Sequence, residues 1–101
     1  MNQQAMMKLR KMQKQMQEAQ ARLEETVYEG TAGGGMVKVE VKGSHEVLSV
    51  NINPDALESK DDIEMIQDTI VAALNDANKK LEKDAEETMG QFTGGFGGFG
   101  F

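Results

Sequence analysis

The segment 36–52, MVKVEVKGSHEVLSVNI, constrains the fold most strongly because its pattern predicts a β-hairpin. Apolar and polar residues alternate in both halves with the period of two that marks a strand with one buried face. A two-residue turn at Gly43-Ser44, with glycine supplying a positive φ, places Val39 opposite Leu48 and all the apolar side chains on one face. A two-stranded hairpin is marginally stable alone, so the flanking segments must cover that face.

The segment before the hairpin predicts a long helix from Asn2 to about Glu25. It is rich in Gln, Lys, Met, Ala and Glu, which favour helices, and it has no Gly or Pro. Its apolar residues follow a spacing of 4, 3, 4, 3 and 4, which is a heptad seam of the coiled-coil type. The seam consists of Ala5, Leu9, Met12, Met16, Ala19 and Leu23. A chain of 101 residues builds only a small core, so we expect Leu9, Met12, Met16 and Leu23 to make core or dimer contacts.

A further strand is predicted from about Val27 to Ala32, followed by three glycines at 33–35. A glycine-rich phosphate loop would continue into Gly-Lys-Ser/Thr and a helix, and neither follows. The triple glycine is therefore predicted to be a tight connection between antiparallel strands.

The segment after the hairpin predicts a capped turn at 53–57 and then a second long helix. Asp61 with Glu64 resembles a capping box at its start, and Gly90 offers a stop just after Met89. The fold class is therefore α+β, with a long N-terminal helix, a three-stranded antiparallel sheet and a long C-terminal helix.

Domain organisation is simple on this interpretation. Residues 1–90 form a single domain and residues 91–101, QFTGGFGGFGF, form a flexible Gly/Phe-rich tail without a regular pattern. Docking of the tail's phenylalanines on a partner or neighbouring subunit is the alternative.

The charges are distributed unevenly along the chain. Residues 1–17 carry four cations and no acid, whereas residues 18–101 hold seven cations against 17 acids, a net charge of −10. A net charge of −6 for the whole chain argues against a polyanionic partner, but the uneven distribution restores that option for the first helix. The four cations, Lys8, Arg10, Lys11 and Lys14, project away from the seam or lie at its edge. A plain solvated face is the competing interpretation.

The sequence offers no recognisable arrangement for catalysis or metal binding. The absence of Cys excludes disulfides and thiolate metal sites, and the only histidine, His45, is predicted to be exposed beside the hairpin turn. No nucleophile and base occur at a recognisable spacing. We therefore expect a protein that is not an enzyme and that uses no cofactor, metal or small-molecule substrate. No apolar run suits a signal peptide or a membrane span, which predicts a cytoplasmic protein without membrane contact.

Four short motifs, in order, resemble the YbaB/EbfC family of small bacterial nucleoid-associated DNA-binding proteins. They are KMQKQMQ at 11–17, GGGMVKV at 33–39, IVAALNDA at 70–77, and the glycine after Met89 together with Thr93-Gly94-Gly95. The resemblance spans essentially the whole chain.

The resemblance implies an α-β-β-β-α protomer that forms a tweezer-like homodimer and binds double-stranded DNA in the nucleoid through its long helices. The residues that match the family's basic first helix are Lys8, Arg10, Lys11 and Lys14, and we expect Gln3 and Gln4 to assist them. Lys79, Lys80 and Lys83 of the last helix are diluted by neighbouring acids, so their contribution is left open. A prefoldin-like chaperone or protein-binding adaptor is the alternative, since it shares the helix–hairpin–helix plan.

Overall fold

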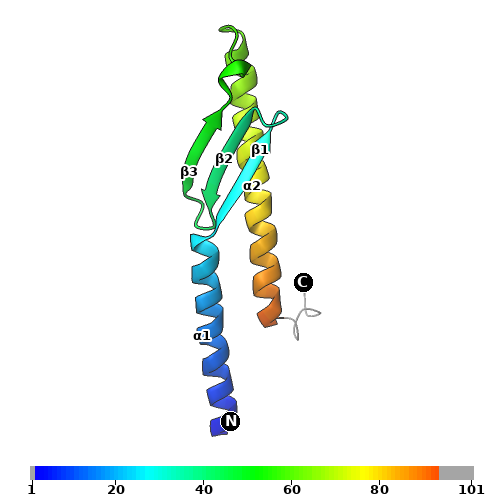
Figure 1. The fold of residues 1–101 in the computed structure, drawn as a ribbon. Helices are drawn as coiled ribbons and strands as arrows, with labels where there is room; N and C mark the ends of the chain where they lie inside the picture. Colours follow the sequence, from blue (N-terminus) through cyan, green and yellow to red (C-terminus); the bar gives the residue numbers. More distant parts are fainter. Residues whose placement is uncertain (1, 94–101) are drawn as a thin grey trace.

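The computed structural model describes residues 2–93 and has the predicted α-β-β-β-α order (Figure 1). Its elements are α1 (Gln3–Glu25), β1 (Val27–Ala32), β2 (Val37–Lys42), β3 (Val47–Ile52), a short 3-10 turn η1 (Pro54–Ala56) and α2 (Asp62–Thr93). The α+β class, the first helix and the three antiparallel strands are confirmed. The sheet has the order β1-β2-β3, so β1 and β3 are its edge strands.

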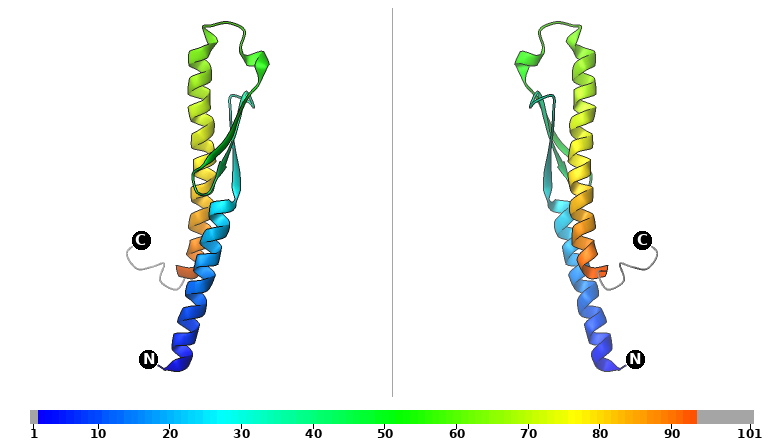
Figure 2. Two further views of the ribbon diagram at one scale, coloured as in Figure 1. Left: turned by 90° about the vertical axis from the view of Figure 1, so that its left-hand side faces the viewer. Right: turned by 90° about the vertical axis from the view of Figure 1, so that its right-hand side faces the viewer.

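The molecule is long and narrow, with extents of 70 × 26 × 15 Å. Helix α2 packs on one face of the sheet and continues below it, where it runs beside the C-terminal part of α1 in the opposite direction (Figures 1 and 2). The N-terminal part of α1 continues past the end of α2. Among residues 2–93, this stretch of helix therefore has no neighbouring helix or strand (Figure 1).

The core lies between α2 and the two strands that it covers. Its buried residues are Val37, Val39 and Val41 of β2 and Ala73, Ala77 and Leu81 of α2. The valines are the alternating residues of the predicted buried face, so the period-two interpretation of β2 is confirmed.

Gly30 of β1 permits the close approach between strand and helix. A Cβ atom at this position would collide with the Ala73 carbonyl oxygen and lie 2.8 Å from the Ala77 Cβ. Glycine on the strand and alanine on the helix therefore set the distance between the two layers.

Strand β3 pairs with β2 in a register two residues away from the predicted one. Val39 lies opposite Val50 rather than Leu48, and the extra residue forms a bulge at Leu48. Because side chains alternate with a period of two, this shift leaves Val50 on the face that was predicted to be apolar. The predicted pairing was wrong, while the predicted face was right.

The register differs because the turn is longer than two residues. The hairpin closes over residues 43–46, with the Lys42 N–H donating to the Glu46 carbonyl oxygen at 2.9 Å. The positive φ of this turn, 74°, belongs to His45 and not to Gly43. In the other connection, the three glycines at 33–35 all have positive φ and join β1 to β2 as predicted.

Gly43 instead lets the end of α1 approach the hairpin. A Cβ there would collide with the Leu23 carbonyl oxygen. The Gly43 N–H donates to the Thr26 carbonyl oxygen at 2.9 Å, and Lys42 Nζ pairs with the Glu25 carboxylate at 3.0 Å. Helix α1 is thus anchored by its last turn.

The connection from β3 to α2 is held by two capping side chains. The Asn53 side chain accepts the Asp55 N–H at 3.0 Å and begins η1, with Pro54 at its first position as predicted. At the start of α2 the Asp62 carboxylate accepts the N–H groups of Glu58 and Ser59 at 2.9 and 3.0 Å.

The predicted end of the second helix at Gly90 was wrong, because α2 continues to Thr93. A Cβ at Gly90 would have no heavy atom within 4 Å, so nothing packed there requires glycine. The remainder of the predicted tail, residues 94–101, lies outside the described residues.

We predict that Gly30→Ala lowers the free energy of unfolding by about 2 kcal/mol, because the added methyl group forces β1 away from α2. Gly90→Ala, the matched control, leaves it unchanged or raises it by up to about 1 kcal/mol, since alanine favours a helix over glycine. Urea denaturation at one protein concentration measures both. Equal stability of Gly30→Ala and the parent protein would contradict the packing argument.

Candidate nucleic-acid interface

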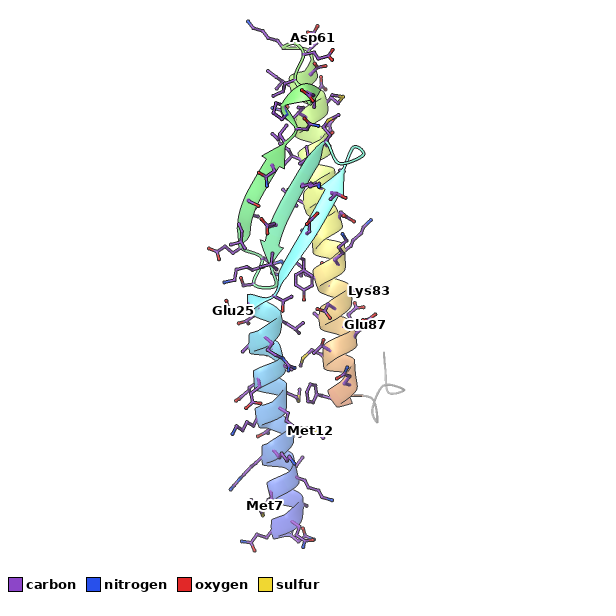
Figure 3. All side chains as sticks on the ribbon, in the orientation of Figure 1. Met7, Met12, Glu25, Asp61, Lys83 and Glu87 are labelled. Atoms are coloured by element: carbon purple, nitrogen blue, oxygen red, sulfur yellow. The ribbon has the colours of Figure 1, made fainter. Side chains whose placement is uncertain are left out.

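All four predicted cations lie on the part of α1 that we call the basic arm, residues 3–14. Figure 3 labels Met7 and Met12 on this segment, which extends beyond the end of α2. The cations are exposed, as are Gln3 and Gln4. The ion pairs of the described residues join Lys42 to two glutamates and Lys80 to Asp76, so no ion pair neutralises the arm.

The arm presents its polar side chains together. At about 100° per residue, Arg10, Lys11 and Lys14 share one face of the helix with the two glutamines, and Lys8 lies at the border of the apolar seam. The helix begins with the Asn2 side chain accepting the Ala5 N–H at 2.8 Å, and its first turn has no acid. The positive end of the helix dipole therefore adds to the potential of the cations.

The apolar seam of α1 divides into two parts. Ala19 is fully buried and Met16 and Leu23 are half-buried beside α2, so this part serves the core of the protomer. Leu9 and Met12, on the arm, are 45% and 41% exposed. The dimer role predicted for the seam stays a prediction for the exposed part.

Two exposed methionines of the arm were missed by sequence reasoning. Met6 and Met7 lie outside the heptad seam and are 43% and 64% exposed. Met7 lies on the same face as the cations, which gives that face an apolar centre. A helical projection of the whole arm, rather than of its seam, would have located it.

A row of charged side chains on α2 forms hydrogen bonds with β1. Asp76 Oδ2 accepts the Thr31 N–H at 3.0 Å, and Lys80 Nζ donates to the Glu29 carbonyl oxygen at 2.8 Å. One turn further on, Asp84 accepts the Tyr28 hydroxyl. Sequence reasoning had treated these charges only as neighbours that dilute one another, and it did not find their contacts with β1.

The lysines of α2 differ in their contacts. The Lys80 amino group is occupied by the β1 backbone and by Asp76, at 3.4 Å. Lys79 and Lys83 are exposed but lie among acids, so α2 offers a polyanion less than the arm does.

Two pKa shifts follow from the contacts of this row. Burial, followed by the hydrogen bond to Asp84 and the charge of its carboxylate, raises the pKa of Tyr28 to about 12. The hydrogen bond from the Thr31 backbone, assisted by Lys80, lowers the pKa of Asp76. Both shifts favour the protonation states that hold β1 on α2 at neutral pH.

No group of three or more metal-ligating side chains occurs among residues 2–93. Within the same residues, no helix is both long and apolar enough to cross a membrane. The exposed cations of the arm are the strongest functional feature of the described chain.

Fold and arm together define a small helix–sheet–helix protein with a cationic helical extension. The model of the YbaB/EbfC DNA-binding family matches residues 1–96, and the chain belongs to this family. A nucleoid-associated protein of Chloroflexus aurantiacus is 46% identical over 99 residues, covering 97% of this chain and 98% of that protein. One from Neisseria meningitidis is 47% identical over 91 residues, covering 89% and 82%.

A solved structure supports the same grouping. The crystal structure of an uncharacterized protein from Helicobacter pylori matches with a TM-score of 0.66 and 30% identity, and the match covers 86% of this chain and 91% of that one. The family resemblance inferred from the four sequence motifs is confirmed.

The chain's single tyrosine permits a direct test of the contact between Tyr28 and Asp84. We predict that Tyr28 ionises near pH 12, about two units above an ordinary tyrosine, and that Asp84→Asn lowers this value part of the way. Burial, the largest cause, is retained in the variant. Alkaline titration of absorbance at 295 nm measures both.

The contribution of Tyr28 to the stability of the fold depends on pH. Because the folded-state pKa is raised, the stabilisation by neutral Tyr28 is fully present below pH 10 and is lost as the pH rises toward 12. Ionisation of the folded parent near pH 10 would disprove the contact.

Proposed function

We propose that this protein is a nucleoid-associated protein that binds double-stranded DNA as a homodimer, through phosphate contacts made by the basic arm. The observation that carries the proposal is a set of four exposed cations, in a segment 1–17 that holds no acid, on a helix that extends beyond the end of α2. Membership in a DNA-binding family supports a polyanionic partner for these cations. In the nucleoid, such binding organises DNA or influences gene expression.

The chemistry of the arm favours phosphates over bases. Lys8, Lys11 and Lys14 present point charges, and Arg10 presents a planar donor that pairs with phosphate in a bidentate manner. Gln3 and Gln4 add neutral donors beside them. Specific reading of a base edge requires several side chains held in register against one base pair, and no ion pair among the described residues holds the cations of the arm in this way. We therefore propose weak sequence preference.

The acidic remainder limits affinity without preventing binding. Residues 18–101 carry a net charge of −10, but exposed charges beyond a Debye length of about 8 Å at physiological salt are largely screened. The arm extends away from most of them. Binding is expected to be modest and to weaken early as salt rises.

Incomplete burial of the protomer supports dimerisation. Within residues 2–93, eight hydrophobic residues are fully buried and three of them are alanines, whereas twelve large hydrophobic residues are exposed. A core this thin, beside so much exposed apolar surface, is typical of a protomer whose partner is missing.

Five of the exposed hydrophobic residues of β3 and α2 make up what we call the β3–α2 surface. Helix α2 covers β1 and β2, which leaves the apolar face of β3 open beside the flank of α2 (Figure 1). The surface consists of Val47, Leu48 and Val50 of β3 and Ile63 and Val71 of α2. Two such surfaces, related by a two-fold axis, would cover each other. We propose this contact as the dimer interface, with Leu9 and Met12 of the arm as a second contact.

The DNA test compares two variants of equal charge. In one, Lys8, Arg10, Lys11 and Lys14 all become Gln; in the control, Lys38, Lys60, Lys79 and Lys83 become Gln. The parent is expected to bind unrelated duplexes similarly, with a slope of log K against log salt of up to about −7 if all eight cations of a dimer contact phosphates. The arm variant is expected to lose most of this slope, and the control to keep it.

Two outcomes of the DNA test would contradict the proposal. A folded arm variant with the parent's affinity and slope would show that the arm is a solvated face. Suppression of client aggregation without any DNA binding would favour the chaperone-like alternative.

The dimer test introduces Asp into each apolar surface. Val50→Asp on β3 is expected to give monomers at micromolar concentration, because the buried charge in the interface has no partner. Leu9→Asp with Met12→Asp is expected to weaken the dimer less. Val27→Asp, on the sheet face that α2 does not cover, is the matched control and should stay dimeric. Sedimentation velocity measures all three, and a monomeric parent would disprove dimerisation.

A further inference from the structure

The two edges of the sheet differ in whether side chains of α2 bind their backbone. In an antiparallel edge strand, the N–H and C=O groups of alternate residues point outward and are open to pairing with another strand. The outward groups of β1 include the Glu29 carbonyl and the Thr31 N–H, because the neighbouring residues of β1 point toward β2. An unprotected edge of this kind invites association with a further copy.

Side chains of α2 occupy these two groups. The Asp76 carboxylate accepts the Thr31 N–H at 3.0 Å, and the Lys80 ammonium donates to the Glu29 carbonyl oxygen at 2.8 Å. The two side chains lie one helical turn apart and pair with each other at 3.4 Å. We call this arrangement the edge clamp.

The opposite edge has no such cover. Within the described residues, the hydrogen bonds between side chains of α2 and the sheet all go to β1, and none goes to the backbone of β3. Strand β3 also carries the exposed apolar face beside the flank of α2. One edge is therefore closed by the chain itself, and the other is left next to an apolar surface.

We propose that the edge clamp of Asp76 and Lys80 blocks strand addition at β1 and thereby limits self-association to surfaces on the β3 side. A second copy of this chain is the partner that the clamp excludes. With both edges open, copies would add to each other at both ends of the sheet, and the assembly would not close. The proposal does not depend on DNA binding.

Charge and position both suit this role. A new strand would have to displace two charge-assisted hydrogen bonds at the centre of a six-residue strand. It would also approach a carboxylate and an ammonium group that would lose solvent without gaining partners. Charged side chains at a sheet edge are a common device against edge-to-edge pairing.

The test opens the clamp and then blocks the opened edge. Asp76→Ala with Lys80→Ala removes the clamp, and Asp68→Ala with Lys79→Ala removes the same charges from exposed positions elsewhere on α2. Adding Thr31→Pro to the clamp variant removes the N–H that a new strand would need, a change that an outer edge tolerates. Sedimentation velocity over a concentration series measures size, and amide hydrogen exchange at Thr31 reports the opening.

The clamp variant is expected to exchange the Thr31 amide at least tenfold faster and to form species larger than those of the parent. The control pair and the Thr31→Pro rescue should keep the parent's size. A folded clamp variant with fast exchange and the parent's size would overturn the proposal, as would large species that persist after the rescue. If the double variant does not fold, Asp76→Ala alone gives the same readings, because it removes the carboxylate that accepts the Thr31 N–H.

Discussion

The close approach of the Gly30 backbone to Ala73 and Ala77 governs the arrangement of the whole protomer. It brings α2 directly over β1 and β2, so that side chains on its flank reach the outer edge of β1. The same placement leaves the third strand without a helix, since one helix about 10 Å wide cannot cover three strands spaced about 4.8 Å apart. Closure at β1 and exposure at β3 are thus two consequences of one packing contact.

The anchoring of α1 explains how a helix can extend without being part of the core. Its last turn is held by the Gly43 contact and the Lys42–Glu25 ion pair, and Ala19 is buried one to two turns earlier. Among the described residues, the hydrogen bonds that hold the arm are those of its own helix and its Asn2 cap, and isolated helices of about 12 residues are marginal in water. Contact with a duplex or with a second copy would supply the missing stabilisation, which couples the order of the arm to its proposed function.

Local rules predicted most of this fold, and the errors arose where distant segments meet. Period-two alternation located Val37, Val39 and Val41 in the core, because side chains alternate between the two faces of a strand and a buried face therefore has apolar residues at every second position. The register at Val39 depended on the length of the turn and on which residue takes a positive φ, and in the structure this residue is His45, while Gly43 contacts the end of α1. The roles of Asp76 and Lys80 were hidden for a similar reason, since a charged pair on a helix looks solvated until the strand edge that it binds is known. The cations of the arm needed no such partner and were located by composition alone.

The separation of charge along the molecule bears on the DNA binding proposed for the arm, because it would favour approach of a duplex from one end. If the four cations of residues 1–17 were distributed among the 17 acids, the field near every surface would be negative and a duplex would be repelled from all sides. On residues 1–17, which hold no acid, they form a locally positive segment, and the charges on distant parts of the 70 Å molecule are screened from it. In the proposed binding mode the acids would constrain orientation, because a duplex drawn to the arms would be repelled from the sheet and from α2. In a two-fold dimer joined through the β3–α2 surfaces, this repulsion would hold the DNA at the arms and away from the interface, so that binding DNA and keeping the dimer do not compete.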